Sequence, residues 1–92
     1  MTRLKLRYLP PLCDIVNKSE ETVVAVDGIS VQGLAEYCSL LYGWRFRELF
    51  FDLEGNFTPR VVITVNGLAA HDYDWKLADG DELTFVPPVA GG

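Results

Sequence analysis

The chain has 92 residues, which is the length of one domain. Hydrophobic residues make up 49% of it and aromatic residues 12%, so the chain can form a packed core and is not intrinsically disordered. The formal net charge of -5 argues against nucleic-acid binding, which usually needs a basic face. This charge suits a partner with a basic surface, although acidity is also common among soluble domains.

The composition also limits metal, disulfide and membrane functions. Cys13 and Cys38 are far apart in the sequence, and together with the single His71 they form no familiar zinc-binding spacing. We expect two buried free thiols in a reducing compartment, with a disulfide between them as the alternative. The sequence shows neither a signal peptide nor an apolar run long enough to span a membrane, so we expect a cytoplasmic protein that does not bind membranes.

The N-terminal segment predicts two paired strands. Basic and apolar residues alternate here in the order Arg3, Leu4, Lys5, Leu6, Arg7 and Tyr8. This alternation indicates a strand with one apolar and one basic face, and the basic face is either solvated or a local contact patch. Pro10 and Pro11 end the strand, and residues 12–19 form either a short helical turn or a loop. Residues 22–26 are rich in β-branched side chains and predict the second strand.

The next segment predicts one main helix and one short helix. Ser30 is a good N-cap and Gly43 suits the left-handed position after the last turn, so we expect a helix over Val31–Tyr42. Its expected core-facing residues are Val31, Leu34, Ala35, Cys38, Leu41 and Tyr42. Residues 45–50 predict the short helix, and the aromatic residues around it are expected to pack in the core. The interleaved arginines could stack on nucleic-acid bases, but the acidity of the chain argues against that function.

A hairpin is predicted after the helices. Residues 61–65 form a continuous β-branched run, which predicts a central, well-buried strand. Asn66 and Gly67 favour a type I′ turn, and residues 68–70 would form the short returning strand. Residues 71–77 predict a loop or a single helical turn that packs one aromatic side chain and leaves His71 on the surface.

The C-terminal segment predicts a turn, a strand and a tail. Residues 79–81 read Asp-Gly-Asp and favour a tight turn, because glycine adopts positive φ without steric cost. Residues 82–86 alternate like a half-buried strand, with Leu83 and Phe85 on one face. Two prolines then prevent further ladder hydrogen bonds. We therefore expect residues 87–92 to form a flexible tail that extends by up to roughly 20 Å.

The chain end has a distinctive chemistry. Gly91 and Gly92 have no side chains, so the tail is thin enough to enter a narrow channel. The α-carboxylate of Gly92 has a reference pKa of about 3.5 and is ionised at neutral pH. It can attack the α-phosphorus of ATP held by another protein. A terminal Gly-Gly could also be only a frayed end, but its combination with the turn, the strand and the two prolines is more specific.

The same segment resembles a known family. Residues 79–92, with their Pro-Pro-Val-Ala-Gly-Gly ending, resemble the C-terminus of the MoaD/ThiS family of ubiquitin-like sulfur carrier proteins, and the ending is closest to MoaD. Residues 47–49, 52–56 and 65–67 are also similar to the family. The resemblance implies an α+β fold of the β-grasp type, a mixed sheet of about five strands covered by one main helix and a short second helix. It places the last strand in the middle of the sheet, parallel to the first.

The resemblance also implies how the chain is divided and which residues act. Residues 1–86 would form the β-grasp domain and residues 87–92 the tail. Gly92 would be the reacting residue, as an acyl-adenylate and then a thiocarboxylate, with Gly91 beside it. We expect partners to contact the exposed face of the last strands and five residues near the chain end, which are Phe85, Pro87, Pro88, Val89 and Ala90.

By this resemblance the chain is a protein co-substrate and not an enzyme. A MoeB/ThiF-type adenylating enzyme would use ATP to activate Gly92, and the chain itself would bind no cofactor and no metal. A MoaE-type synthase large subunit, or another sulfur-accepting synthase, would receive the sulfur. Molybdopterin synthesis, for a molybdenum or tungsten cofactor, is the pathway that the ending favours. Sulfur donation to thiazole, cysteine or tRNA is the alternative within this class.

Two further classes of function remain open from the sequence. A covalent protein modifier would use the same adenylation of Gly92 and then be ligated to a lysine. A β-grasp interaction module with an inert tail would bind partners through the sheet alone. An intrinsic enzyme is disfavoured, because the sequence has no recognisable catalytic triad, metal cluster, paired carboxylate motif or phosphate-binding glycine loop.

Overall fold

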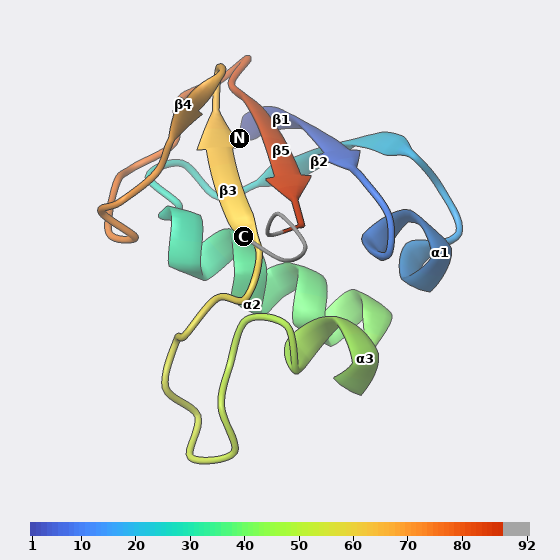
Figure 1. The fold of residues 1–92 in the computed structure, drawn as a ribbon. Coiled ribbons are helices and arrows are strands. Elements are labelled where there is room, and N and C mark those ends of the chain that lie inside the picture. Colours follow the sequence, from blue (N-terminus) through green and yellow to red (C-terminus); the bar gives the residue numbers. More distant parts are fainter. Residues whose placement is uncertain (88–92) are drawn as a thin grey trace.

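The computed structural model describes residues 1–87 of the chain. Five strands form one mixed sheet, and helices pack against one of its faces (Figure 1). In chain order the elements are β1 (Thr2–Tyr8), α1 (Leu12–Val16), β2 (Glu20–Ala25), α2 (Val31–Tyr42), α3 (Trp44–Arg47), β3 (Val62–Val65), β4 (Leu68–Ala69) and β5 (Glu82–Val86). The predicted α+β class and the number of strands are therefore confirmed.

The last strand lies in the middle of the sheet. The strand order is β2-β1-β5-β3-β4, with β5 parallel to β1 and antiparallel to β3. Both terminal strands are thus neighbours, as the family resemblance implied. The β1–β2 and β3–β4 pairs are antiparallel. Helix α2 is the crossover that carries the chain from the β2 edge to the other side of the sheet (Figure 1).

The main helix has the predicted bounds, and most of its predicted core face is buried. The Ser30 hydroxyl accepts a hydrogen bond from the Gly33 backbone N–H at 3.0 Å, which caps its N-terminus. Leu41 was expected in the core, but its side chain is exposed, and Ser39 is buried instead. Ser39 can be buried because its hydroxyl donates to the Ala35 carbonyl at 2.8 Å, which satisfies the polar group.

The ends of the helices also differ from the sequence prediction. Gly43 has a positive φ of 87° but an extended ψ of -164°, so the chain turns there directly into α3 rather than forming a left-handed cap. Helix α3 is shorter than the predicted 45–50 and ends at Arg47. Trp44 was expected to pack in the core but is 67% exposed, because α3 begins at this residue and turns Phe46, not Trp44, into the core. Residues 12–19, for which a loop was the alternative, contain helix α1.

The strands near the sheet edges show two further differences. Strand β2 begins at Glu20, two positions before the predicted 22–26. Residues 61–65 were expected to form a well-buried central strand, and strand β3 does lie inside the sheet between β5 and β4, but only one of its faces is buried. The burial of β3 alternates, with Val62 exposed, because the helices cover only one face of the sheet. The predicted turn is confirmed, since Asn66 and Gly67 both have positive φ, 52° and 86°.

The cysteines are both free. Cys38 is fully buried on the core face of α2, as expected, whereas Cys13 is only half-buried. Burial raises the pKa of the Cys38 thiol to about 12, so this group stays protonated and packs as a small apolar side chain. His71 is exposed, as predicted. Within residues 1–87, no helix has the length and apolar character needed to cross a membrane.

A carboxylate shared by two tyrosines joins three elements at the edge of the core. Glu21 of β2 accepts hydrogen bonds from the hydroxyl of Tyr8 at 2.5 Å and from the hydroxyl of Tyr42, and Lys18 forms an ion pair with it at 3.4 Å. Burial alone would raise the pKa of Glu21, but the bonds from Tyr42 and Tyr8 outweigh burial and hold this pKa below its ordinary value. Burial, reinforced by Glu21, raises the pKa of both tyrosines.

This cluster predicts a pH dependence of stability. Because the pKa of Glu21 is lower in the folded chain, its stabilisation is fully present above the unfolded value of about 4.3 and is lost as the pH falls through the folded pKa. We expect Glu21→Gln to be less stable than the wild type near neutral pH. The difference should shrink in urea denaturation curves recorded at progressively acidic pH.

The control for this measurement is Glu54→Gln. The Glu54 side chain has no ion pair or side-chain hydrogen bond among residues 1–87. Its free energy of unfolding should follow that of the wild type at every pH. If Glu21→Gln also followed the wild type, the shared carboxylate would contribute nothing to stability.

Candidate functional site

The end of β5 is fixed by the aromatic core. The Phe85 ring is stacked on Tyr8 with a centroid distance of 5.6 Å, and it meets Phe46 and Phe50 edge-on at 6.2 and 5.6 Å. The Phe85 carbonyl accepts a hydrogen bond from the Leu9 N–H at 3.3 Å. Such aromatic contacts are directional, so they fix where the strand stops and where the chain leaves the sheet.

The start of β5 is fixed by two turns that bind each other. The Asn66 side chain accepts from the Glu82 N–H at 2.9 Å and donates to the Asp81 carboxylate at 2.9 Å. The Asn66 N–H donates to the Glu82 carbonyl at 2.7 Å, and Asp81 accepts from the Ala78 N–H at 2.8 Å. The β3–β4 turn is thereby joined to the turn before β5, which sets the register of the central strand.

The outer face of the sheet carries a small uncharged patch beside the exit of the chain. Val62 of β3 lies opposite Val86 of β5, and Thr64 lies opposite Thr84. These four side chains are exposed or half-buried, and the helices lie on the other side of the sheet (Figure 1). We call Val62, Thr64, Thr84 and Val86 the outer patch. It adjoins Pro87, the last residue that the structure describes.

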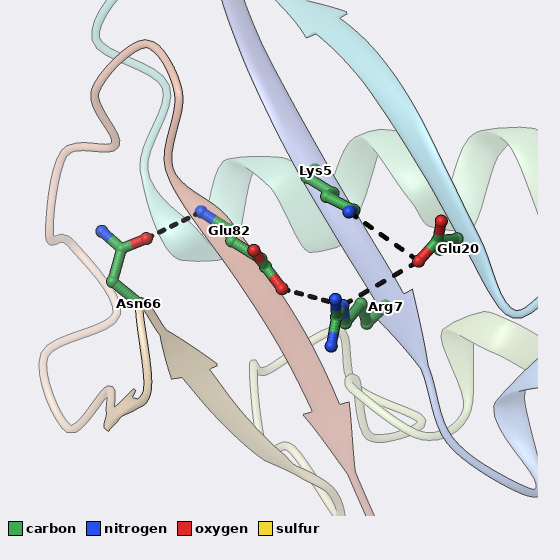
Figure 2. A network of polar contacts seen from close by, with 5 residues as sticks. All are labelled: Lys5, Arg7, Glu20, Asn66 and Glu82. Atoms are coloured by element: carbon green, nitrogen blue, oxygen red, sulfur yellow. Dashed lines mark hydrogen bonds and ion pairs between the residues drawn. The ribbon is translucent and has the colours of Figure 1, made fainter.

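Charged residues border the outer patch on the β1 side. Figure 2 shows the Arg7 side chain between two carboxylates, with Nε at 2.8 Å from Glu82 and at 3.9 Å from Glu20. Lys5 also lies 3.9 Å from Glu20. The basic face predicted for β1 is therefore largely neutralised by its neighbours. Exposed ion pairs of this kind contribute little to the free energy of folding. Their main effect is on the distribution of charge over this surface.

The predicted site residues have different outcomes. Phe85 was expected to contact partners, but its side chain is 1% exposed and packs in the core, so it does not belong to the surface. The sequence could have shown that Phe85 is buried, because strand alternation places its side chain on the same face as that of Leu83. Pro87 is half-buried at the end of β5. The predicted contacts Pro88, Val89 and Ala90, and the reactive Gly91 and Gly92, lie outside the described residues.

The described part of the chain offers no metal site. No group of three or more His, Cys, Asp and Glu residues within residues 1–87 is placed to bind a metal ion. The acidic loop after α3 is held by its own backbone, because Asp52 accepts hydrogen bonds from the N–H groups of Asn56 and Glu54 at 2.8 and 2.9 Å. The Asn56 backbone bond, with the others, keeps the pKa of Asp52 below its ordinary value. This carboxylate therefore has a structural role.

Comparison with known proteins identifies the family of the chain. The model of the ThiS family matches residues 6–92, which is nearly the whole sequence. The chain belongs to the ThiS family. Its family is thus one of small ubiquitin-like sulfur carriers, as the C-terminal resemblance implied. A search of curated proteins found no match to this sequence.

Solved structures support the same fold. The H. volcanii small archaeal modifier protein 1 has a TM-score of 0.82 at 19% identity, and the match covers 97% of this chain and 100% of that one. A putative molybdopterin converting factor subunit 1 from Pyrococcus furiosus has a TM-score of 0.78 at 26% identity, covering 97% and 100%. A complex of subunits 1 and 2 of molybdopterin-converting factor from Helicobacter pylori gives 0.61 at 20% identity, covering 99% and 100%. The ubiquitin-like β-grasp fold is therefore confirmed.

The contact between the turns can be tested with glycine substitutions. Asn66→Gly keeps a residue that accepts positive φ but removes both side-chain hydrogen bonds, so we expect a loss of about 1–2 kcal/mol in the free energy of unfolding. Asn17→Gly is the matched control, because Asn17 also has a positive φ, 61°, and its side chain has no hydrogen bond within residues 1–87. The control should change stability by less than about 0.5 kcal/mol. Equal losses in both variants would show that the Asn66 side chain does not hold the turns together.

Proposed function

We propose that Gly92 is the reactive end of this sulfur carrier and that the chain acts as a protein co-substrate. The observation that carries the proposal is the Gly-Gly ending, which follows the central strand of a ThiS-family fold after four intervening residues. Strand β5 is held on both sides by neighbouring strands, so the point where the tail begins is fixed relative to the outer patch. A partner that binds this surface would therefore receive the chain end at a defined place.

The chemistry takes place in the active sites of partners. A Gly92 carboxylate oxygen attacks the α-phosphorus of ATP bound by a MoeB/ThiF-type adenylating enzyme, and pyrophosphate leaves. The sulfur of a hydrosulfide ion then attacks the carbonyl carbon and AMP leaves, which gives the thiocarboxylate. The absence of a Cβ at Gly91 and Gly92 lets the end pass through a narrow channel. The folded domain supplies recognition.

The outer patch is the proposed docking surface. It combines apolar Val62 and Val86 with the hydroxyls of Thr64 and Thr84, and it lies where the chain leaves the sheet. The bordering charges of Arg7 and the carboxylates would orient a partner more than they would bind it. Phe85 takes part only indirectly, by anchoring β5 beneath this surface.

We further propose molybdopterin synthesis as the pathway, with a MoaE-type large subunit as sulfur acceptor. The Pro-Pro-Val-Ala-Gly-Gly ending supports this choice, and so do the names of the P. furiosus and H. pylori relatives. Ligation to proteins is the second candidate, because the H. volcanii relative is a small archaeal modifier protein. Both candidates share the adenylation of Gly92 and differ in what receives the activated end.

The first test is the mass of the chain end. We expect incubation with ATP, a MoeB/ThiF-type enzyme of the same genome and a sulfur donor to replace one oxygen of the C-terminal carboxylate by sulfur. Intact-mass spectrometry followed by fragmentation should place the added mass on Gly92. Adding one residue after Gly92 should abolish the product without changing the circular dichroism spectrum. An unmodified wild-type end would contradict the proposal, and conjugates of high mass in lysate would favour the modifier.

The docking surface can be tested with two matched valine variants. Val62 and Val24 are both exposed on the outer face, but Val62 belongs to the outer patch and Val24 lies on the edge strand β2. We expect Val62→Arg to reduce the rate of adenylation at low carrier concentration by about tenfold or more, since a charge at the centre of an interface disrupts its packing. Val24→Arg should stay near the wild-type rate. Equal rates for the two variants would exclude the outer patch as the docking surface.

A further inference from the structure

A groove lies along the open edge of β3. Among the described residues, β4 pairs only with Thr64 and Val65, and one more hydrogen bond joins Ala70 to Ile63, so the edge is open before Ile63. The groove has a volume of about 290 Å³. We call it the β3 groove, and its walls include Arg60, Val61 and Val62 on one side and Ala70, His71 and Tyr73 on the other.

The backbone of Val61 is unpaired at this edge. Val61 is only 6% exposed, yet its N–H and C=O have no backbone hydrogen-bond partner within residues 1–87. The Ile63 carbonyl accepts from the Ala70 N–H at 2.8 Å, on the β4 side. By strand alternation the Val61 groups point to the same side, along the groove. An extended segment laid on this edge would supply the partners that such groups require.

The charge of the β3 groove differs from that of the chain as a whole. The chain has a net charge of -5, but no carboxylate of the described residues lines the groove. Asp72 follows His71 in the sequence, but its carboxylate accepts from the Asp74 N–H at 2.9 Å instead. Arg60 is exposed and has no ion pair in the part of the chain that the structure describes. The groove therefore suits an extended apolar segment with one negative charge.

The end of the chain itself has these properties. Residues 88–92 read Pro-Val-Ala-Gly-Gly, and their one charge is the α-carboxylate of Gly92. They begin close to the groove, because Val86 lies opposite Val62, which lines it on the face of the sheet away from the helices (Figure 1). Five extended residues span up to roughly 17 Å, and neighbouring strands are about 4.8 Å apart. The chain end is therefore long enough to cross β3 and reach Arg60.

We propose that residues 88–92 fold back across β3 into the β3 groove and that the Gly92 carboxylate binds the Arg60 guanidinium. An ion pair at the surface is weak, so the end is released easily. Val62 belongs to both the groove and the outer patch, so a partner that docks on the outer patch displaces the chain end. That release by a partner rests on the proposed function, whereas the binding of the chain end to its own groove does not.

The first test is NMR spectroscopy of the full-length chain without any partner. We expect Arg60→Gln to shift the amide resonances of Gly91 and Gly92 and to lower their heteronuclear NOE, because loss of the ion pair frees the chain end on the picosecond to nanosecond timescale. Arg45→Gln is the matched control. Arg45 is also exposed and without an ion pair within residues 1–87, but it lies on α3, outside the groove.

The control should leave both signals as in the wild type. Identical Gly91 and Gly92 signals in the wild type and both variants would overturn the proposal. No activating enzyme takes part, so this failure would leave the proposed adenylation of Gly92 untouched. Signals that change with protein concentration would also overturn it, because they would show that the end binds another copy and not its own groove.

The Val61 amide gives an independent test. Replacing the Gly92 carboxylate by a C-terminal amide removes the charge and keeps all 92 residues. We expect the Val61 N–H to exchange with solvent about tenfold faster in this amidated chain, because the segment that covers it is released. The Leu83 N–H, in the central strand, should exchange at the wild-type rate and shows that the fold is intact. Equal exchange of Val61 in the two chains would refute the fold-back.

Discussion

The structure depends on the burial of β5 between β1 and β3. This strand comes last in the chain, yet it pairs with the first strand on one side and with β3 on the other, so it joins two otherwise separate hairpins. Its two inward side chains, Leu83 and Phe85, are almost completely buried. Burying a large apolar side chain contributes about 1.5–3 kcal/mol, so these two residues account for a considerable part of the stability of a small domain.

The polar contacts at the two ends of β5 complement this burial. At the start of β5, the Asn66 side chain accepts the hydrogen bond of the Glu82 N–H, as a backbone carbonyl of a neighbouring strand would. The β3–β4 turn and the loop before β5 therefore meet without leaving this backbone group unpaired. At its end, the Tyr8 ring packs on Phe85 while the Tyr8 hydroxyl reaches Glu21. The same tyrosine thus serves both the apolar core and the polar cluster at its edge, which couples the N-terminal hairpin to the exit of the chain.

Local signals predicted the elements well and the surfaces less well. Ser30 and Gly43 set the limits of α2, and Asn66 with Gly67 set the hairpin turn, because capping and positive φ depend on neighbouring residues alone. The central position of β5 came from the resemblance at the C-terminus. The burial of Ser39 in place of Leu41 could not be predicted, since it depends on how α2 is rotated over the sheet.

Long-range arrangements account for the other differences. The exposure of Val62 depends on which face of the sheet the helices cover, and a run of β-branched residues does not contain that information. The outer patch joins residues of β3 and β5 and became visible only with the register. The Glu21 cluster likewise draws on Tyr8, Glu21 and Tyr42 from three separate elements. The Gly-Gly ending, by contrast, is a contiguous signal and was recognisable from the sequence.

The central position of the last strand has a consequence for biosynthesis. A ribosome releases β1 and β2 long before β5, and the hairpins cannot close into one sheet until residues 82–86 have emerged. Contacts between segments that are far apart in the sequence are the slowest to form, so folding of the domain would be completed only after β5 has left the ribosome. A truncated product that lacks β5 would lack the centre of its sheet and expose apolar surface to proteases. The topology therefore makes a stable domain depend on the synthesis of the chain through β5.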